Sequence, residues 1–184
     1  KIPFIADEVQ SGVGRTGKWW AFEHFGIVPD VMASAKALQV GATLANKKLF
    51  PSEQGSISST WGGGHIIDLA NGIATIHTIK KDRLLQKNLR HGTYLRQGLT
   101  ELTSTDFSIQ NVRGIGLMNA FDLSTKRLRD DLVLQLLKQG VIVLGCGKQG
   151  IRIIPPYIVT KHEIDLFLHE LESALKICKK KGPV

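Results

Sequence analysis

Two short apolar runs limit the folds open to this chain of 184 residues more than any other feature. Residues 2–6 precede a glycine-rich loop, and residues 30–34 follow a proline. Apolar runs of this length between turn residues predict short strands that are buried in a parallel sheet. Asp7 ends the first run, and Lys36 comes shortly after the second. Because ligands bind beyond the carboxyl ends of parallel strands, we expect both side chains at one functional edge of the sheet.

Beyond these runs the chain alternates β-like and helical segments. Isoleucines and leucines recur at three- and four-residue spacing from about residue 65 to 102, with a break near residues 80–82, which predicts two consecutive helices. We further expect strands near 42–47, 116–122, 141–144 and 151–153, and helices near 126–139 and 161–178. This order predicts an α/β fold in which a larger sheet is accompanied by a small α+β lobe.

The composition is that of an ordinary globular protein, with 42% apolar and 22% charged residues. No long apolar run or signal-like N-terminus occurs, which argues against a membrane protein and for a cytoplasmic one. Cys146 and Cys178 cannot form a disulfide framework and are expected to be free thiols. The net charge of +8 comes from scattered basic residues without interleaved aromatic ones, so we expect no nucleic-acid partner. The six histidines lack metal-ligand spacing, and no metal is predicted.

An acid and an amine at the edge of a parallel sheet suit one cofactor in particular. Pyridoxal phosphate needs a lysine for a Schiff base and a carboxylate that keeps its pyridine nitrogen protonated. Lys36 and Asp7 can supply these groups, and the small or apolar neighbours Ala35, Ala37 and Leu38 predict a partly dry site for the amine. The alternatives are an ordinary surface lysine and an aspartate that caps a helix or forms a turn.

The loop at residues 12–17, GVGRTG, matches the G-x-G-x-x-G pattern of dinucleotide-binding proteins. Two acidic residues separate it from the apolar run, and the bulky residues Lys18, Trp19 and Trp20 follow it. Such bulk is unfavourable for a helix that must pack closely on a sheet. We therefore interpret the segment as an ordinary tight loop or a loop near the cofactor, and not as a dinucleotide site.

A series of short strings along the chain is similar to one known family. They are DEVQSGVGRTG (7–17), AFEHFG (21–26), PDVM (29–32), AKAL (35–38), STWGG (59–63), VRGIGLM (112–118) and IRIIPP (151–156). In this order they resemble the class III, or ω-type, pyridoxal phosphate aminotransferases, most closely the 4-aminobutyrate and L-lysine 6-aminotransferase branch. The resemblance implies the C-terminal half of such an enzyme. Residues 1–103 would be the second half of a fold-type I large domain with a mostly parallel sheet, and residues 104–184 the small C-terminal α+β domain.

The resemblance also assigns contacts with the cofactor. It implies that Lys36 forms the Schiff base and moves a proton between substrate and cofactor, while Asp7 pairs with the pyridinium nitrogen. Val9 would pack on the ring and Gln10 would hydrogen-bond the ring hydroxyl oxygen; a buried strand residue and a solvated turn are the alternatives at these two positions. Thr60 would reach the phosphate of the neighbouring subunit's cofactor, which implies a homodimer, unless it is a loop cap.

Arg152 is the expected substrate-binding residue. An arginine between apolar residues is costly to bury without a carboxylate, which it binds through two hydrogen bonds. The resemblance implies the carboxylate of glutamate or 2-oxoglutarate, and a structural salt bridge is the alternative. Arg113, which lies in a turn motif, is interpreted as structural.

The reaction implied by the resemblance moves an ω-amino group from a donor of the 4-aminobutyrate or L-lysine type to 2-oxoglutarate. We expect this activity only when the missing N-terminal half is present. The alternative is a non-catalytic binding or assembly module that comes from a truncated or split gene.

Overall fold

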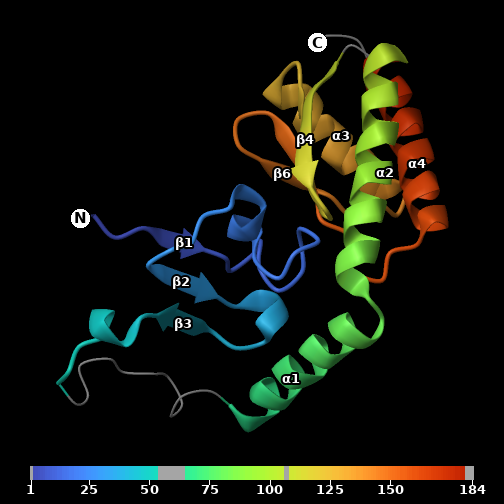
Figure 1. Cartoon of the computed structure of the whole chain (residues 1–184). Helices are drawn as coiled ribbons and strands as arrows, with labels where there is room; N and C mark the ends of the chain where they lie inside the picture. The colour runs from blue at the N-terminus through green and yellow to red at the C-terminus, as the bar shows by residue number, and fades with distance from the viewer. Residues whose placement is uncertain (1, 54–64, 106–107, 181–184) are drawn as a thin grey trace. The chain divides into compact units, whose positions relative to one another are not determined.

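The computed structural model describes residues 2–53, 65–105 and 108–180 (Figure 1). The chain is of the predicted α/β class and divides into two compact units, residues 1–87 and residues 88–184. The domain boundary expected after residue 103 stays a prediction.

A small sheet organises the first unit. Its strands are β1 (Ile5–Asp7), β2 (Val31–Ser34) and β3 (Ala42–Ala45), in the order β1-β2-β3. β1 and β2 are parallel, as the two apolar runs predict, whereas β3 is antiparallel to β2. The short link between β2 and β3 explains the reversal, because a parallel connection needs a crossover of a dozen or more residues. Short 3-10 helices, η1 (Ala21–Phe25), η2 (Lys36–Leu38) and η3 (Lys47–Leu49), lie in the connections.

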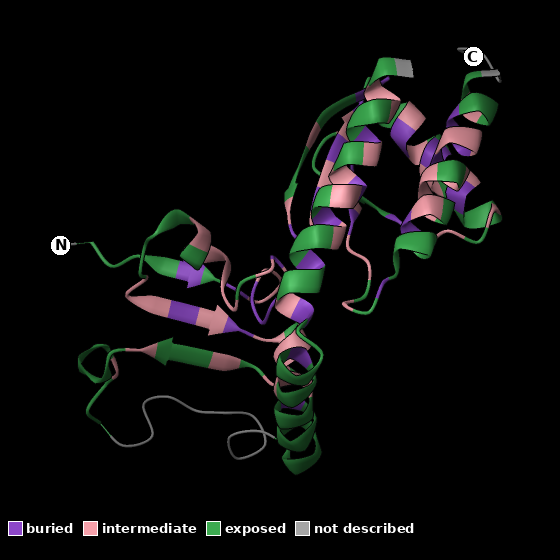
Figure 2. Cartoon of the chain, turned by 45° about the vertical axis from the view of Figure 1, so that its right-hand side comes forward, coloured by how far each residue is buried: buried purple, intermediate pink, exposed green. Residues whose placement is uncertain are grey.

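Two helices follow, as the spacing of isoleucines and leucines predicts. α1 spans Ile66–Lys81 and α2 spans Leu84–Thr105. Between them Arg83 adopts a left-handed conformation with φ of 52°, which is uncommon for a residue with a side chain and interrupts the helix. Burial along α1 is uneven: Ile79 is buried, but Ile66 and Ile73 are 81% and 58% exposed. Most of the helix is exposed (Figure 2). No described element of the first unit covers that side of the helix.

An antiparallel sheet and the helices packed on it form the second unit. Its strands are β4 (Ile109–Ile115), β5 (Met118–Leu123), β6 (Leu144–Cys146) and β7 (Gly150–Ile153), in the order β4-β5-β7-β6, and α3 (Lys126–Lys138) and α4 (Lys161–Lys180) join α2. The core contains Leu99, Phe121, Leu136, Ile151 and Leu171, none of which retains exposed surface. Since these residues come from α2, β5, α3, β7 and α4, one core holds both layers together.

Two strands of this sheet differ from the sequence prediction. β4 was not among the expected strands. Asn111 is left-handed there, with φ of 51°, and the register with β5 shifts close to it, so the strand lacks a regular alternation. The strand expected at residues 141–144 begins only at Leu144. Val143 is buried in the core outside the ladder, which accounts for the apolar run that suggested a strand.

The VRGIGLM string, residues 112–118, covers the end of β4, the tight turn after it and the first residue of β5. Gly116 adopts φ of 55°, and Gly92 of α2 packs against it so closely that a Cβ on Gly92 would overlap the Gly116 carbonyl oxygen. Arg113 donates a 2.9 Å hydrogen bond to the Asp122 carboxylate, in agreement with a structural role. The string therefore fastens the hairpin to α2.

Two expectations from composition can be compared with this structure. Cys146 and Cys178 are both free thiols. Among the helices in the described ranges, none is long and apolar enough to cross a membrane.

Candidate active site

The carboxyl ends of β1 and β2 bring Asp7 and the Lys36 turn to one edge of the first sheet. Asp7 is the last residue of β1 and pairs in register with Ala33 of β2. β2 ends at Ser34, and Lys36 begins η2 directly afterwards. The parallel register therefore places the acid and the amine at the same edge, as the two apolar runs predict. The catalytic roles of both residues stay predictions.

Asp7 presents its carboxylate away from the buried face of the sheet. Burial alternates along β1, so that Ala6 is buried while Asp7 is exposed. Oδ1 of Asp7 accepts a hydrogen bond from the backbone N–H of Val9 at 3.0 Å, which is a turn of the kind that aspartate often makes. Within the part of the chain that the structure describes, this carboxylate has no ion-pair partner. It is therefore available to a positively charged group.

Glu8 faces the opposite way and anchors the following loop. The residue is 3% exposed, and its carboxylate accepts hydrogen bonds from Ala21 N at 3.0 Å, Phe22 N at 2.9 Å and Ser11 Oγ at 2.6 Å. The backbone N–H of Glu8 also extends the pairing with β2 by donating to the Ala33 carbonyl at 2.8 Å. Glu8 is not among the predicted cofactor or substrate contacts, and its hydrogen bonds give it a structural role. Two consecutive acids at a strand end are a usable signal, since alternation turns one of them inward.

The GVGRTG loop does not have the geometry of a dinucleotide-binding motif. The residues after Gly17 form turns and then the 3-10 helix η1, which starts only at Ala21, and not an α-helix packed on the sheet. Gly12 lies against the Trp20 ring, and Gly14 and Gly17 have φ of 92° and 90°. The glycines thus serve a compact loop that returns to Glu8 and leaves the Asp7 edge open.

Lys36 occupies an unusual backbone conformation. Its φ is 49°, and Gln39, three residues later, has φ of 68°. The Gln39 backbone N–H and Nε2 both donate to the Lys36 carbonyl, at 2.8 Å and 3.2 Å. Left-handed residues with side chains are uncommon and cost energy, and they persist where the surroundings impose them, often at functional sites.

The surroundings of the Lys36 amine differ from the expectation. The small neighbours predict a partly dry site, but the structure leaves Lys36 exposed. α1 packs against the turn η2, and this contact leaves the Lys36 side chain exposed. No ion-pair partner of Lys36 occurs among the residues that are described. Among the described residues, no carboxylate therefore competes for this amine.

The remaining cofactor-contact candidates are less defined. Val9 and Gln10 are half-buried and lie in the turn that follows Asp7, next to the candidate edge. Val9 is therefore not the buried strand residue that one alternative predicted, whereas Gln10 is in a turn. Thr60 lies outside the described residues.

Arg152 belongs to the second unit. It sits in β7, where it pairs with Ala120 of β5 and Leu144 of β6, and it is half-buried. In the described ranges no carboxylate forms an ion pair with it, so the alternative of a structural salt bridge has no partner there. Its role in binding a substrate carboxylate stays a prediction.

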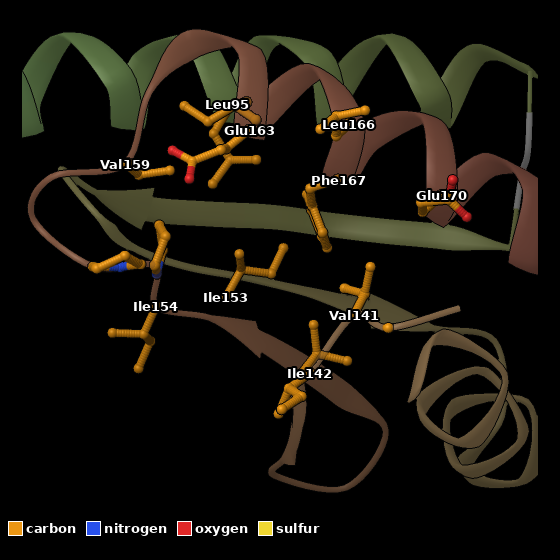
Figure 3. A pocket seen from close by; sticks show the side chains of 15 residues that line it. Leu95, Val141, Ile142, Ile153, Ile154, Val159, Glu163, Leu166, Phe167 and Glu170 are labelled. Atoms are coloured by element: carbon orange, nitrogen blue, oxygen red, sulfur yellow. The ribbon is translucent and has the colours of Figure 1, made fainter. Parts of the chain in front are cut away.

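The second unit also contains an apolar cavity of about 470 Å³ beside α4 (Figure 3). Ile142, Ile154 and Phe167 line it, together with the carboxylates of Glu163 and Glu170. Glu163 accepts hydrogen bonds from Thr160 N at 2.7 Å and Thr160 Oγ1 at 2.8 Å, which hold the pKa of Glu163 below its ordinary value. This carboxylate therefore caps the start of α4. No candidate cofactor or substrate residue lines the cavity.

The groups at the β1 and β2 edge fit pyridoxal phosphate. An amine without an ionic partner can condense with the cofactor's aldehyde, and an exposed carboxylate can face its ring nitrogen. Lys36 and Asp7 provide both groups at ends of neighbouring parallel strands. The model of one protein family, described as aminotransferase class-III, matches residues 1–175. The chain belongs to the class-III aminotransferase family.

The relatives include proteins named acetylornithine aminotransferase and proteins named L-lysine-epsilon aminotransferase. The acetylornithine aminotransferase of Caldanaerobacter subterraneus is 36% identical over 176 residues, covering 94% of this chain and 44% of the relative. The L-lysine-epsilon aminotransferase of Mycobacterium tuberculosis is 36% identical over 184 residues, covering 94% of this chain and 40% of the relative. The chain thus spans less than half the length of these relatives. Lysine aminotransferases are among its relatives, as expected, but acetylornithine aminotransferases are equally similar.

Solved structures of a lysine and an ornithine aminotransferase have the same fold. Lysine aminotransferase from M. tuberculosis in the internal aldimine form superposes with a TM-score of 0.91 at 35% identity, over 96% of this chain and 42% of that one. Ornithine delta-aminotransferase of Plasmodium falciparum superposes with a TM-score of 0.86 at 29% identity, over 96% of this chain and 48% of that one. The fold is therefore that of the fold-type I aminotransferases, of which this chain corresponds to the C-terminal part.

Proposed function

We propose that this chain is the lysine-bearing part of a pyridoxal phosphate-dependent aminotransferase. The observation that supports this most is the parallel register of β1 with β2, which sets Asp7 and Lys36 at one edge. Membership of the class-III family supports the reaction class. Because the chain spans 40% to 44% of its relatives' length, the proposed activity belongs to an assembly that also contains the remainder of such an enzyme.

The proposed reaction exchanges an amine for a carbonyl. An ω-amino donor of the 4-aminobutyrate or L-lysine type loses its amino group and two electrons and becomes an aldehyde. 2-Oxoglutarate gains the amino group and the electrons and becomes glutamate, so no further oxidant or reductant is needed. When bound, pyridoxal phosphate supplies an electron sink for the charge that remains when the substrate C–H bond breaks.

Lys36 and Asp7 carry the chemical roles in this proposal. Lys36 would hold the cofactor through its amine. Once an amino substrate has taken its place, the freed Lys36 amine would act as the general base and acid that accepts the proton from the substrate carbon and gives it back. Asp7 keeps the ring nitrogen protonated, which is consistent with an exposed carboxylate that has one backbone donor. Val9 and Gln10, in the adjacent turn, orient the ring.

Substrate and subunit contacts complete the proposal. Arg152, without an ionic partner among the residues described, binds the carboxylate of the substrate. Thr60 binds the cofactor phosphate of a second subunit, which implies a homodimer. We place the enzyme in the cytoplasm.

Borohydride reduction tests the central assignment. In the protein that contains this chain, incubated with pyridoxal phosphate, reduction should fix the pyridoxyl group on Lys36, and peptide mapping locates it. Lys36→Ala should abolish the labelling. Lys47→Ala, in an exposed turn of the same unit, should leave it unchanged.

Two results would count against the proposal. Labelling of Lys47 or Lys48 in place of Lys36 would overturn the assignment of the cofactor lysine. Labelling of Lys36 without turnover of any ω-amino donor by the assembled enzyme would favour a non-catalytic binding or assembly module.

A further inference from the structure

Gly72 of α1 lies against the turn that carries Lys36. A Cβ on Gly72 would come within 2.5 Å of the Leu38 carbonyl oxygen, which is a backbone atom of η2. Gly72 is buried although most of α1 is exposed. A backbone oxygen cannot rotate away as the end of a side chain can, so a side chain at position 72 would displace α1 or η2.

The turn η2 depends on outside support for its shape. Lys36 and Gln39 are both left-handed, and the hydrogen bonds that the turn makes to the Lys36 carbonyl come from Gln39 itself. Such conformations persist when the surrounding structure imposes them. In the described part of the first unit, α1 is the helix that packs on this turn.

Glycine at this point of α1 is otherwise unfavourable. In the middle of a helix glycine destabilises the helix relative to alanine, because its backbone loses more freedom on folding. The φ of Gly72 is not in the left-handed region, so no special backbone conformation requires glycine. The close approach of the Leu38 carbonyl is what explains it.

We infer that Gly72 is a positioning residue for Lys36. By admitting the backbone of η2 against α1, it sets the position of the lysine turn relative to the strand end that bears Asp7. Gly72 itself contacts neither substrate nor cofactor in this account. The inference rests on the proposed function of Lys36 as the amine that binds pyridoxal phosphate.

Gly72→Ala tests the inference in the cofactor-loaded protein that contains this chain. The midpoint of the pH titration of the Schiff-base absorbance should shift by about one pH unit. The reason is that displacing Lys36 changes the distance between its nitrogen and the Asp7 carboxylate. The kcat should fall about tenfold with little change in KM, as for a misplaced reacting group. The apo protein should melt at a lower temperature in spite of the gain in helix propensity, because the new Cβ pushes α1 from η2.

Asn71→Ala is the matched control. Asn71 is the exposed neighbour on the same helix, so its replacement also raises helix propensity, by somewhat less than Gly72→Ala, without meeting η2. Neither the titration midpoint nor kcat should change. A Gly72→Ala protein whose midpoint and kcat equal those of the Asn71→Ala protein would overturn the inference while the proposed function stands. An unmodified protein in which Lys36 forms no Schiff base would instead overturn the proposed function.

Hydrogen exchange on the unmodified protein that contains this chain tests the same packing without a variant. If α1 holds the turn, the Gln39 amide should exchange with the same opening free energy as the amides in the middle of α1. Rapid exchange at Gln39 beside a protected α1 would overturn the inference, even if Gly72→Ala does not fold.

Discussion

The hydroxyl of Tyr94 in α2 donates a 2.5 Å hydrogen bond to the carboxylate of Asp165 in α4. Lys161 Nζ lies 3.3 Å from the other carboxylate oxygen and 4.6 Å from the centre of the Tyr94 ring. The hydrogen bond from Tyr94, and then that from Lys161, hold the pKa of Asp165 below its ordinary value. Two helices of the second unit are therefore joined by a charge-assisted hydrogen bond.

Tyr94→Phe should lower the stability of the second unit near neutral pH and weaken its pH dependence. Because the pKa of Asp165 is lowered by folding, its contribution is present above the unfolded pKa and is lost as the pH falls through the folded pKa. Urea unfolding should give a lower free energy of unfolding for the variant than for the wild type at neutral pH. At about pH 3 the two free energies should be similar. Gln97→Ala, an exposed change on α2, is the control. An equal loss at both pH values would indicate lost packing and not a lost hydrogen bond.

Glu8→Gln should destabilise the first unit by about 2 kcal/mol. In the wild-type protein two backbone N–H groups donate to the Glu8 carboxylate, and in the variant the amide NH₂ would face one of these donors. Those groups belong to Ala21 and Phe22. Guanidinium unfolding followed by tryptophan fluorescence measures the change, since Trp20 lies in the anchored loop. Glu23→Gln is the matched control: Glu23 is exposed and accepts from Trp20 N alone, so a smaller loss is expected. Equal losses in the two variants would contradict the anchoring role of Glu8.

Asp7→Asn should leave the fold largely intact and lower transamination by orders of magnitude, because a neutral amide no longer holds the proton of the cofactor ring. Asp7 is exposed and its one hydrogen bond with Val9 N can be kept by an amide oxygen. Single-turnover rates and thermal unfolding separate the two effects. Asp30→Asn is a control at the opposite end of β2, where the carboxylate accepts from Phe4 N. Near-normal single-turnover rates in Asp7→Asn would refute the assignment.

The chain of 184 residues on its own should self-associate and bind pyridoxal phosphate weakly. α1 exposes Ile66 and Ile73, and the outer edge of β1 is unpaired in the described sheet, so apolar surface and strand hydrogen-bonding groups are both accessible. Light scattering should give an apparent mass that rises with protein concentration. The double variant Ile66→Lys and Ile73→Lys should show a smaller rise. Schiff-base absorbance on adding cofactor measures binding. A stable monomer that binds the cofactor tightly would contradict this prediction.

Much of the first unit follows from local sequence. The two parallel strands lie in the apolar runs that turn residues bound, and the break before α2 lies where the helical spacing of isoleucines and leucines is interrupted. β4 could not be found in this way, because Asn111 and Gly114 interrupt its alternation and the strand exists through its pairing with β5. The spacing of isoleucines located α1 correctly but not its burial, because periodicity shows which residues share a face and not what covers that face.

The sequence predicts which edge of the sheet carries the candidate site, but not the detailed geometry of that edge. Strand order alone brings Asp7 and Lys36 together, since both follow apolar runs. The left-handed conformation of Lys36 and the contact between Gly72 and Leu38 depend on packing between segments that are distant in sequence. Lysine has no intrinsic preference for positive φ, so nothing in the local sequence signals that conformation.

The parallel pairing of β1 with β2 also has a consequence for the order of folding. α1 and α2 form from residues that are neighbours in sequence, whereas β1 and β2 can meet only after the intervening loop has closed. Pairing of distant segments is slower than local helix formation, because the closure entropy is lost before the contacts are gained. During refolding, the edge with Asp7 and Lys36 should therefore be among the last parts of the first unit to form. A proteolytic fragment that lacks either strand cannot reproduce it.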